Sequence, residues 1–355
     1  MLVGSAHAHL VALARFARRP LPGVELHWVT RGEQAVYTGM LPGWVAGELT
    51  RADLTVELRP LALAARAALH PEGAVGIEAP SRSVRLAGGE LVEADVLSLG
   101  IGSGLRGLAL PGVREHASNV RLLAARAEHF QASPGPAVVV GGGLGGVELA
   151  LCLRAACDRV SLVSETEEIP QGAPPPLVRA VKRALADRGV QPVQGRAVRV
   201  TAEEVTLSDG RRLPARTVLW ATGPAPHPLL AASGLELGPS GAVRVGPSLG
   251  STSHPDIFAA GDCADLPAPV PKSGVYSVRE GPVLARNLEA RLCDAPLRPY
   301  RPQGHALALV NFGDGTALLS RGRLVARGRW VRAWKDHLDR GFLDGLRRAA
   351  QRTDP

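Results

Sequence analysis

Residues 141–148 read Gly-Gly-Gly-Leu-Gly-Gly-Val-Glu. They match the pattern G-x-G-x-x-G, in which Gly141, Gly143 and Gly146 occupy the three glycine positions. The apolar segment 137–140 precedes the pattern and predicts a strand, and the segment 144–157 after it predicts a helix. The first glycine permits a tight turn, the second lets a pyrophosphate approach the backbone, and the third lets helix and strand pack closely. This unit therefore predicts a dinucleotide site at the start of the helix.

The next predicted strand, 160–164, indicates which nicotinamide nucleotide binds. It runs into Glu165 and the acidic segment 164–168, which contains no arginine. A carboxylate at this position accepts a hydrogen bond from a ribose 2′-hydroxyl and repels a 2′-phosphate. We therefore expect NADH rather than NADPH.

Another candidate loop lies at the start of the chain, between a short strand, 1–3, and a helix that extends to about residue 19. It is called the first loop below, and the loop at residues 141–146 is called the second glycine loop. Gly4 keeps the first glycine position, whereas Ala6 and His9 replace the second and third. Thr30 and Arg31 follow the second strand, where an acid is usual. By itself this loop is equally compatible with an ordinary strand–helix turn. Further along, the pattern of residues 52–69 predicts a single helix.

The segment 251–264, STSHPDIFAAGDCA, favours the nucleotide interpretation of the first loop. It resembles the FAD signature of the pyridine nucleotide-disulfide oxidoreductase superfamily. Residues 220–223, Trp-Ala-Thr-Gly, resemble the loop at which that superfamily returns from its NAD domain to its FAD domain. The resemblance implies that Asp262 binds the flavin ribityl chain. The chemistry agrees independently, because a carboxylate at a strand end accepts hydrogen bonds from a hydroxylated chain.

Segments 37–43, 97–103, 271–275 and 328–331 narrow the resemblance. They are similar to type II NADH dehydrogenase-like flavoproteins, a subgroup related to the flavoprotein domain sometimes fused to selenide, water dikinase. The likeness covers nearly the whole chain. Its departures are Ala6, the short first strand, and Glu280, where the subgroup tends to have glutamine.

This resemblance implies an α/β fold with two Rossmann-like FAD/NAD(P)-binding domains. The NAD domain, residues 107–235, is inserted into a discontinuous FAD domain made of residues 1–106 and 236–300. A small C-terminal region, 301–355, should form a β-hairpin and a helix.

The expected site residues fall into three groups. Glu148 and Lys272 are the candidate catalytic residues. In the family the position of Glu148 approaches the nicotinamide, although an acid in the first turn also simply favours the helix N-terminus. Lys272 lies in a loop expected beside the flavin, where the start of a helix would stabilise negative charge. We expect FAD to contact Gly4, Ala6, His9, Met40, Pro42, Gly100, Gly261, Asp262, Gly274 and Val275. We expect NADH to contact Gly141, Gly143, Gly146, Glu165, Thr222 and Gly223.

The cysteines do not predict thiol chemistry. Cys152 and Cys157 are five residues apart on the expected NAD helix, so they point about 140° apart and cannot form a disulfide. We expect them to pack in the interior. Cys263 has no partner in the sequence, and the loop 311–315 lacks the cysteine that sulfide:quinone reductases use. His7 and His9 are joined by no cysteine or carboxylate, and we expect no metal.

Composition limits the remaining classes of function. The chain has 355 residues, of which 45% are hydrophobic and 21% charged, as in ordinary folded proteins. Its net charge is +8, but no zinc-finger, helix-turn-helix or RNP motif accompanies that charge, so we expect no nucleic-acid partner. No signal peptide or apolar run of membrane-spanning length is found, so we expect a cytoplasmic protein.

Residues 329–348 predict an amphipathic helix. Trp330, Trp334, Leu338 and Phe342 recur every four residues. The helix is also basic, with Arg329, Arg332, Lys335, Arg340, Arg347 and Arg348. Two interpretations stay open: peripheral contact with the anionic inner face of the cytoplasmic membrane, or docking on the protein itself or on a second copy in an oligomer.

Together these features predict an FAD-dependent NADH oxidoreductase. Hydride would pass from NADH to FAD, and the electrons would then pass to an acceptor. Without a cysteine pair, family analogy favours a quinone. The alternatives are a reductase of a soluble electron-transfer partner, a low-turnover flavin redox sensor or scaffold, and an accessory role in selenium metabolism.

Overall fold

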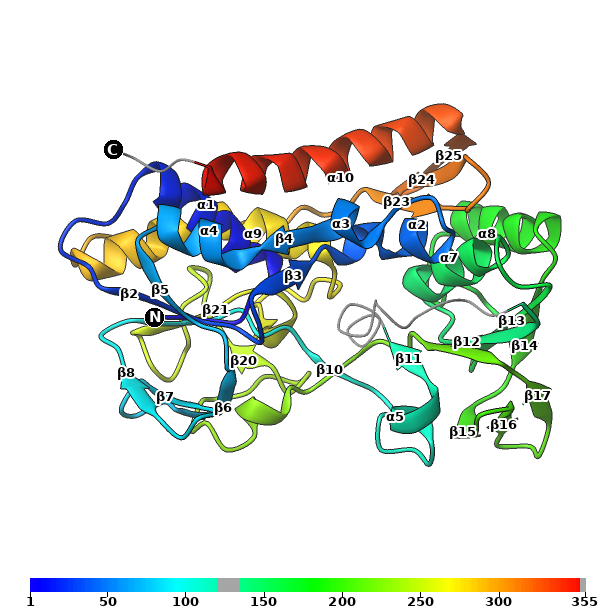
Figure 1. Ribbon diagram of the computed structural model, residues 1–355, viewed down its shortest axis with the longest axis horizontal. Helices are drawn as coiled ribbons and strands as arrows, with labels where there is room; N and C mark the ends of the chain where they lie inside the picture. The colour runs from blue at the N-terminus through cyan, green and yellow to red at the C-terminus, as the bar shows by residue number, and fades with distance from the viewer. Residues whose placement is uncertain (120–133, 352–355) are drawn as a thin grey trace.

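The computed structural model describes residues 1–119 and 134–351. Two five-stranded parallel sheets lie side by side along the long axis, and helices cover one side of both (Figure 1). This is the α/β architecture expected from the two strand–loop–helix units.

The first sheet is built from two distant parts of the chain. Its strand order is β21-β9-β1-β2-β5, and all neighbouring strands are parallel. The sheet therefore has the discontinuous composition that the sequence predicts. The strands are β1 (Leu2–Val3), β2 (Leu26–Val29), β5 (Ala67–His70), β9 (Leu97–Leu99) and β21 (Ile257–Ala259). The helices above it are α1 (His7–Arg18), α4 (Leu58–Ala64) and α9 (Gly274–Leu292).

The second sheet has the order β11-β18-β12-β13-β14. Its central strand β12 is long enough to pair with β13 over its full length and with β18 over four residues. The strands are β11 (Ser118–Asn119), β12 (Pro136–Val140), β13 (Arg159–Ser164), β14 (Val190–Gln194) and β18 (Thr217–Trp220). Helices α7 (Leu144–Leu153) and α8 (Pro175–Asp187) pack on one face. The antiparallel strands β15 (Ala197–Val200), β16 (Glu204–Leu207) and β17 (Arg212–Pro214) lie below.

The chain crosses between the two sheets through paired segments. The short strands β10 (Gly104–Leu105) and β19 (Pro224–Ala225) are antiparallel partners. The outgoing and returning crossings thus lie at residues 104–105 and 224–225, beside the domain boundary that we propose at residues 106–107 and ten residues before the one that we propose at 235–236.

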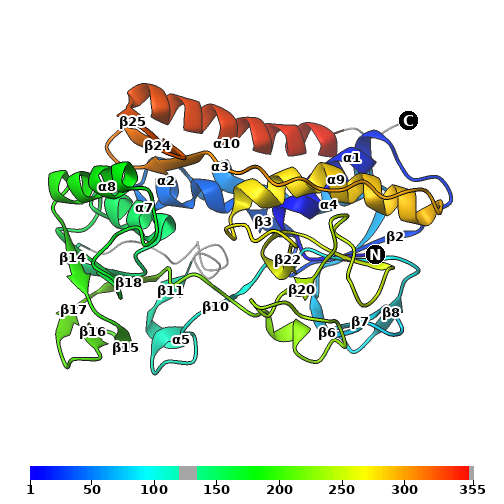
Figure 2. The ribbon, with the colours of Figure 1, turned by 180° about the vertical axis from the view of Figure 1, so that it is seen from behind.

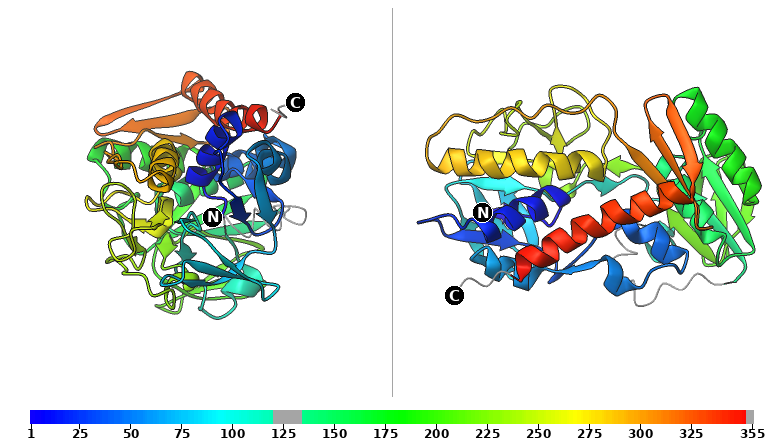
Figure 3. Two further views of the ribbon diagram at one scale, coloured as in Figure 1. Left: turned by 90° about the vertical axis from the view of Figure 1, so that its left-hand side faces the viewer. Right: turned by 90° about the horizontal axis from the view of Figure 1, so that it is seen from above.

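Residues 301–351 form a bridge rather than an appendage. Three antiparallel strands, one more than the expected hairpin, precede a long helix: β23 (Ala308–Asn311), β24 (Ala317–Arg321), β25 (Leu324–Gly328) and α10 (Arg329–Ala350). Helix α10 contacts α1 and α4 in one half, whereas β23 contacts α7 and β25 contacts α8 in the other. Figure 2 shows this bridge from behind, and Figure 3 shows from above that α1 lies between α10 and α9.

The prediction of one helix over residues 52–69 was wrong. The segment contains α3 (Arg51–Leu54), β4 (Thr55–Glu57) and α4, and ends in β5. Strand β4 interrupts the helical pattern because it pairs with β3 (Gln34–Val36), and β5 takes the edge of the first sheet beside β2. Tertiary pairing here overrides local helix preference.

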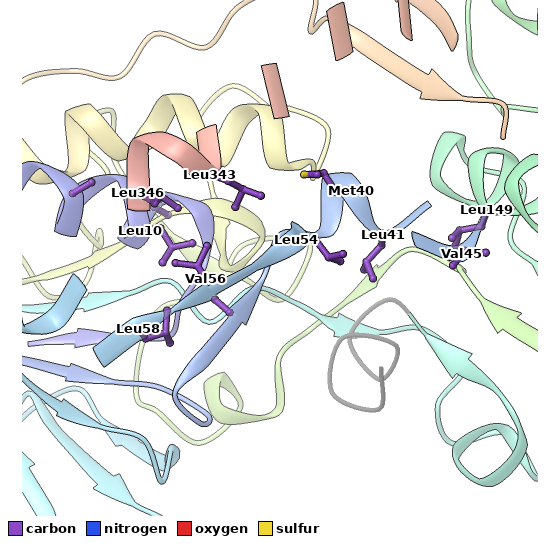
Figure 4. Close-up of a cluster of buried hydrophobic side chains, with 14 of the residues drawn as sticks. Leu10, Met40, Leu41, Val45, Leu54, Val56, Leu58, Leu149, Leu343 and Leu346 are labelled. Carbon is purple, nitrogen blue, oxygen red and sulfur yellow. The ribbon is translucent and has the colours of Figure 1, made fainter. Parts of the chain in front are cut away.

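The main hydrophobic core is continuous between the halves. Leu10 and Val56 lie in the first half, Leu149 in the second, and Leu343 on α10 (Figure 4). Helix α2 (Leu41–Val45) places Leu41 between them. The remaining strands are β6 (Ala74–Glu78), β7 (Ser83–Leu86), β8 (Leu91–Glu93), β20 (Val243–Arg244) and β22 (Ala264–Asp265); α5 (Val113–His116) and the 3-10 turns η1 (Thr38–Met40), η2 (Pro228–Leu230) and η3 (Gly261–Cys263) complete the fold.

Candidate functional site

The loop between β12 and α7 fits a dinucleotide pyrophosphate. Gly141 has φ +127°, and a Cβ there would collide with the Ala221 carbonyl. A Cβ at Gly146 would collide with the Gly141 carbonyl. A Cβ at Gly143 would meet no heavy atom within 4 Å, so this glycine faces open space. No side chain caps α7, which leaves its first N–H groups available to an anion.

The other expected NADH residues lie at the same edge of the second sheet. Glu165 directly follows β13 and is exposed. Thr222 and Gly223 follow β18, and the Thr222 hydroxyl donates to the Arg106 carbonyl oxygen at 2.6 Å. The structure therefore gathers the six expected residues around the carboxyl ends of three neighbouring parallel strands, where nucleotides bind in such sheets.

The first loop accommodates its departures from the glycine pattern. Gly4 has φ +94°, and the Ala6 N–H, at the start of α1, donates to the Gly100 carbonyl oxygen at 3.1 Å. His9 is fully buried, with Nδ1 2.8 Å from the Gly4 carbonyl oxygen and Nε2 2.8 Å from Ser98 Oγ. A Cβ at Gly100 would lie 2.7 Å from His9 Nδ1. The room that the third glycine usually provides is therefore supplied by Gly100.

Gly261 and Asp262 follow β21 after one residue, at the same edge of the first sheet as this loop. The Ser103 hydroxyl donates to Asp262 Oδ2 at 3.5 Å. Helix α9 begins at Gly274, close to the His7 ring, and the following Val275 is exposed. No side chain caps α1 or α9. A carboxylate and two uncapped helix starts suit the hydroxylated and phosphorylated parts of FAD.

Three expected site residues have other contacts. Met40 and Pro42 are buried, and Met40 belongs to the main core, which also includes Leu343 of α10 (Figure 4). The Lys272 ammonium donates to the Ala264 carbonyl oxygen and to Asp265 Oδ1, the latter at 3.0 Å. Lys272 and Asp262 nevertheless line the same small cavity.

The cysteines Cys152, Cys157 and Cys263 are buried and unlinked. The prediction that Cys152 and Cys157 pack in the interior is confirmed.

Glu148 is the centre of a network that the sequence did not reveal. Its side chain is 14% exposed, and Oε1 accepts from the Asn311 backbone N–H at 2.7 Å. Lys335 Nζ lies 3.8 Å from the same oxygen. Burial raises the pKa of Glu148, and it outweighs the opposing influence of Lys335 and the Asn311 N–H.

Lys335 continues this network into α10. Its Nζ donates to the Gly39 carbonyl oxygen at 2.8 Å and to Asp339 Oδ2 at 2.9 Å. Asp339 Oδ1 accepts from the Tyr37 hydroxyl at 3.0 Å. Burial alone would lower the pKa of Lys335, but the carboxylates of Glu148 and Asp339 raise it. The lysine is thus held charged beside a carboxyl group that keeps its proton more readily than usual.

Asn311 ties the network to both halves of the molecule. Its Nδ2 donates to Glu48 Oε2 at 2.8 Å, and its Oδ1 accepts from Arg332 Nη1 at 2.9 Å. Arg332 also pairs with Glu48 at 2.6 Å. The sequence signal for this network was the i,i+4 spacing of Lys335 and Asp339. It was missed because Lys335 was considered only as one of the residues that make the helix basic.

Helix α10 buries one apolar face against the protein and exposes other apolar side chains to solvent. Trp330, Trp334 and Leu338 are 57%, 39% and 44% exposed. Phe342 instead turns inward, with its ring 5.0 Å from that of Tyr37. Among residues 1–119 and 134–351, no helix is long and apolar enough to cross a membrane.

Comparison with known proteins identifies the family. The sequence model of the pyridine nucleotide-disulphide oxidoreductases matches residues 1–281. The chain belongs to this family.

Relatives within the family differ in the partners that their names indicate. An NADH dehydrogenase-like protein of Mycobacterium tuberculosis is 29% identical over 74% of this chain and 73% of its own length. A probable ferredoxin reductase of Castellaniella defragrans is 30% identical over 58% of this chain and 52% of its own length. The chain thus spans only about half of the second relative.

Solved structures show the same fold over the whole chain. The sulfide:quinone oxidoreductase of Aquifex aeolicus has a TM-score of 0.80 at 19% identity, covering 98% of this chain and 91% of its own. The type II NADH dehydrogenase of Plasmodium falciparum, solved with NADH, has a TM-score of 0.73 at 11% identity, covering 100% and 98%.

Proposed function

We propose that the protein is an FAD-dependent NADH oxidoreductase that reduces a quinone. The overall reaction is NADH + H⁺ + quinone → NAD⁺ + hydroquinone. The second glycine loop supports the first half of this reaction, and the buried pair of Glu148 and Lys335 supports the choice of acceptor.

The two loops give the cofactors separate sites. The loop at Gly141, Gly143 and Gly146 binds the NADH pyrophosphate, Glu165 accepts from the ribose hydroxyls, and Thr222 and Gly223 form the opposite wall. Glu148, in the first turn of α7, positions the nicotinamide. This arrangement favours NADH because Glu165 would repel a 2′-phosphate.

FAD, when bound, supplies the group that accepts hydride and releases electrons. The start of α1, with Gly4, Ala6 and Gly100, would hold its diphosphate, and His9 fixes this loop through Gly4 and Ser98. Asp262, next to Gly261, would accept from the ribityl hydroxyls, and the start of α9 at Gly274 and Val275 would bind the flavin. Met40 and Pro42 shape the neighbouring wall, and Lys272 adds positive charge near Asp262.

The chemistry of the acceptor distinguishes a quinone from a soluble iron–sulfur partner. A quinone takes up two electrons and two protons, whereas a one-electron iron–sulfur centre takes up no protons. Glu148 retains a proton more readily than an exposed glutamate, and Lys335 lies 3.8 Å from it. Buried groups that hold protons beside the expected nicotinamide position favour the quinone. The ferredoxin reductase relative keeps the soluble partner as the competing candidate.

The exposed side of α10 supports contact with the membrane in which quinones dissolve. Trp330 and Trp334 are typical of the lipid–water interface, and the exposed Arg340 and Arg348 on the same helix suit anionic lipid. We propose peripheral contact through residues 329–348.

Acceptor assays with a Lys335→Met variant test this function. We expect the wild type to oxidise NADH with a short-chain quinone, and Lys335→Met to lower that rate about 10-fold or more. The rate with ferricyanide, which takes electrons without protons, should change much less. Lys182→Met, on the exposed side of α8, is the control and should behave as the wild type. Wild-type activity with ferricyanide or ferredoxin but not with quinones would refute the quinone assignment.

A further inference from the structure

A cluster of histidines and glutamates lies at the carboxyl end of β5, the edge strand of the first sheet, next to Thr30 and Arg31. His70 ends the edge strand β5, Glu72 follows it, and Glu90 lies in the turn between β7 and β8 (Figure 1). One ligand atom from each of these residues lies within 4.8 Å of the other two. None of these residues is among the expected FAD or NADH contacts, and the expectation of no metal was drawn from His7 and His9 without considering them.

A chain of contacts leads into the cluster from the neighbouring strand. Glu25 Oε1 lies 3.2 Å from His27 Nε2, and His27 Nδ1 lies 3.0 Å from His70 Nε2. His70 Nδ1 then faces Glu72 Oε1 at 3.8 Å. The two imidazole rings are stacked, with centroids 5.3 Å apart.

The contacts leave one ring nitrogen of His70 for the glutamates. His70 Nε2 is taken up by His27 Nδ1, whereas His70 Nδ1 lies 3.8 Å from Glu72 Oε1, which is too far for a hydrogen bond. Two ligand atoms that each lie about 2.0–2.2 Å from one metal ion are separated by up to roughly 4 Å. The gap between His70 Nδ1 and Glu72 Oε1 therefore suits a bridging ion.

The ion is placed at His70 because Glu90 joins the other residues only there. Arg31 lies opposite Glu72 in an antiparallel bridge, but among the described residues no lysine or arginine forms an ion pair with Glu72 or Glu90. A metal-bound histidine usually donates its other ring N–H to a neighbouring acceptor, and His27 provides that acceptor.

The backbone holds the ligands in place. Residues 31 and 72 form an antiparallel bridge, and the Glu90 carbonyl oxygen accepts from the Leu86 N–H at 2.8 Å. The His70 side chain is only 18% exposed, whereas Glu72 is 37% exposed and can close the remaining distance to a metal.

We propose that His70, Glu72 and Glu90 bind one divalent transition-metal ion, with His27 positioning His70. An imidazole with two carboxylates suits ions such as Zn²⁺ rather than Ca²⁺ or Mg²⁺, which prefer oxygen ligands alone. Water completes the coordination at this open surface. The ion links the edge of the first sheet to the β7–β8 turn.

Metal titration of the full-length protein tests the proposal. After treatment with a chelator, calorimetry with ZnCl₂ should show one saturable site per chain, and Co²⁺ should give a visible absorption band from the same site. His70→Gln and Glu90→Gln should abolish both signals. Glu93→Gln, an exposed glutamate on the same hairpin, should leave them unchanged. His27→Gln keeps all three ligands and should weaken binding about 10-fold.

Circular dichroism of each variant checks that it is folded. The proposal would be overturned if the wild type bound Zn²⁺ with a Kd of about 1 mM or higher, as adventitious surface sites do. It would also be overturned if the wild type and Glu90→Gln bound the ion equally well. Both outcomes would mean that His70, Glu72 and Glu90 do not bind an ion together.

Discussion

His9 occupies the position at which the first loop departs furthest from its expected pattern. The sequence showed that a glycine was missing there, but it could not show what compensates for it. The compensating residue is Gly100, which is distant in sequence and reaches His9 only because β9 pairs with β1. Gly141, Gly143 and Gly146 were predictable because the turn and the helix that require them lie in the same short stretch of sequence. That Gly100 makes room for His9 could not be predicted in this way, because it depends on the sheet topology.

The buried His9 should make stability depend on pH. Burial lowers its pKa from 6.5 to about 4. The unfolded chain therefore binds a proton near pH 6.5 while the folded protein does not, and the unfolding free energy falls as the pH drops from 6.5 towards 4. The contribution of this residue is at most about 3 kcal/mol.

A comparison of the wild type with His9→Gln measures this contribution. Glutamine can donate to Gly4 and accept from Ser98 but does not titrate in this range. Urea unfolding at pH 7 and pH 5 should show a smaller loss of unfolding free energy in the variant than in the wild type. Equal losses in the two proteins would show that His9 is not the group responsible.

Helix α10 shows which properties of an element can be predicted locally. Its length and amphipathic character followed from the spacing of Trp330, Trp334 and Leu338. The face that docks could not be predicted in the same way. That face carries Lys335 and Asp339, because Glu148 supplies a partner from one distant segment and Tyr37 and Gly39 supply partners from another. Residues 52–69 were mispredicted for the same kind of reason, since β4 and β5 form only when β3 and β2 are present as partners.

The exposed stripe of α10 should bind anionic membranes. The double variant Trp330→Ser, Trp334→Ser should cosediment several-fold less with vesicles of phosphatidylcholine and phosphatidylglycerol. Its melting temperature should change little, because both side chains are substantially exposed. Leu63→Ser, which removes an exposed leucine from α4, is the control and should bind as the wild type does. Unchanged sedimentation of the double variant would refute the membrane contact.

At the scale of the whole molecule, the two nucleotide-binding units were predictable because each carries its own strand–loop–helix pattern. The discontinuous first sheet was predictable only through the resemblance of residues 251–264 to an FAD signature. The bridge formed by residues 301–351 was not foreseen. Its contacts, such as those of Asn311 with Glu48 and Glu148, join segments that share no local pattern. This bridge places the ionisable network between the two halves.

The most direct test of the central claim is an anaerobic titration of the purified protein with NADH, followed by flavin absorbance. We predict that bound FAD is bleached by about one equivalent of NADH. Gly143→Ala should keep its flavin and its melting temperature but require much more NADH, because a methyl group there meets no protein atom and lies where the pyrophosphate approaches. Gly145→Ala, also in open space, should titrate as the wild type does. A protein that binds no FAD, or whose FAD is not reduced by NADH, would contradict the account.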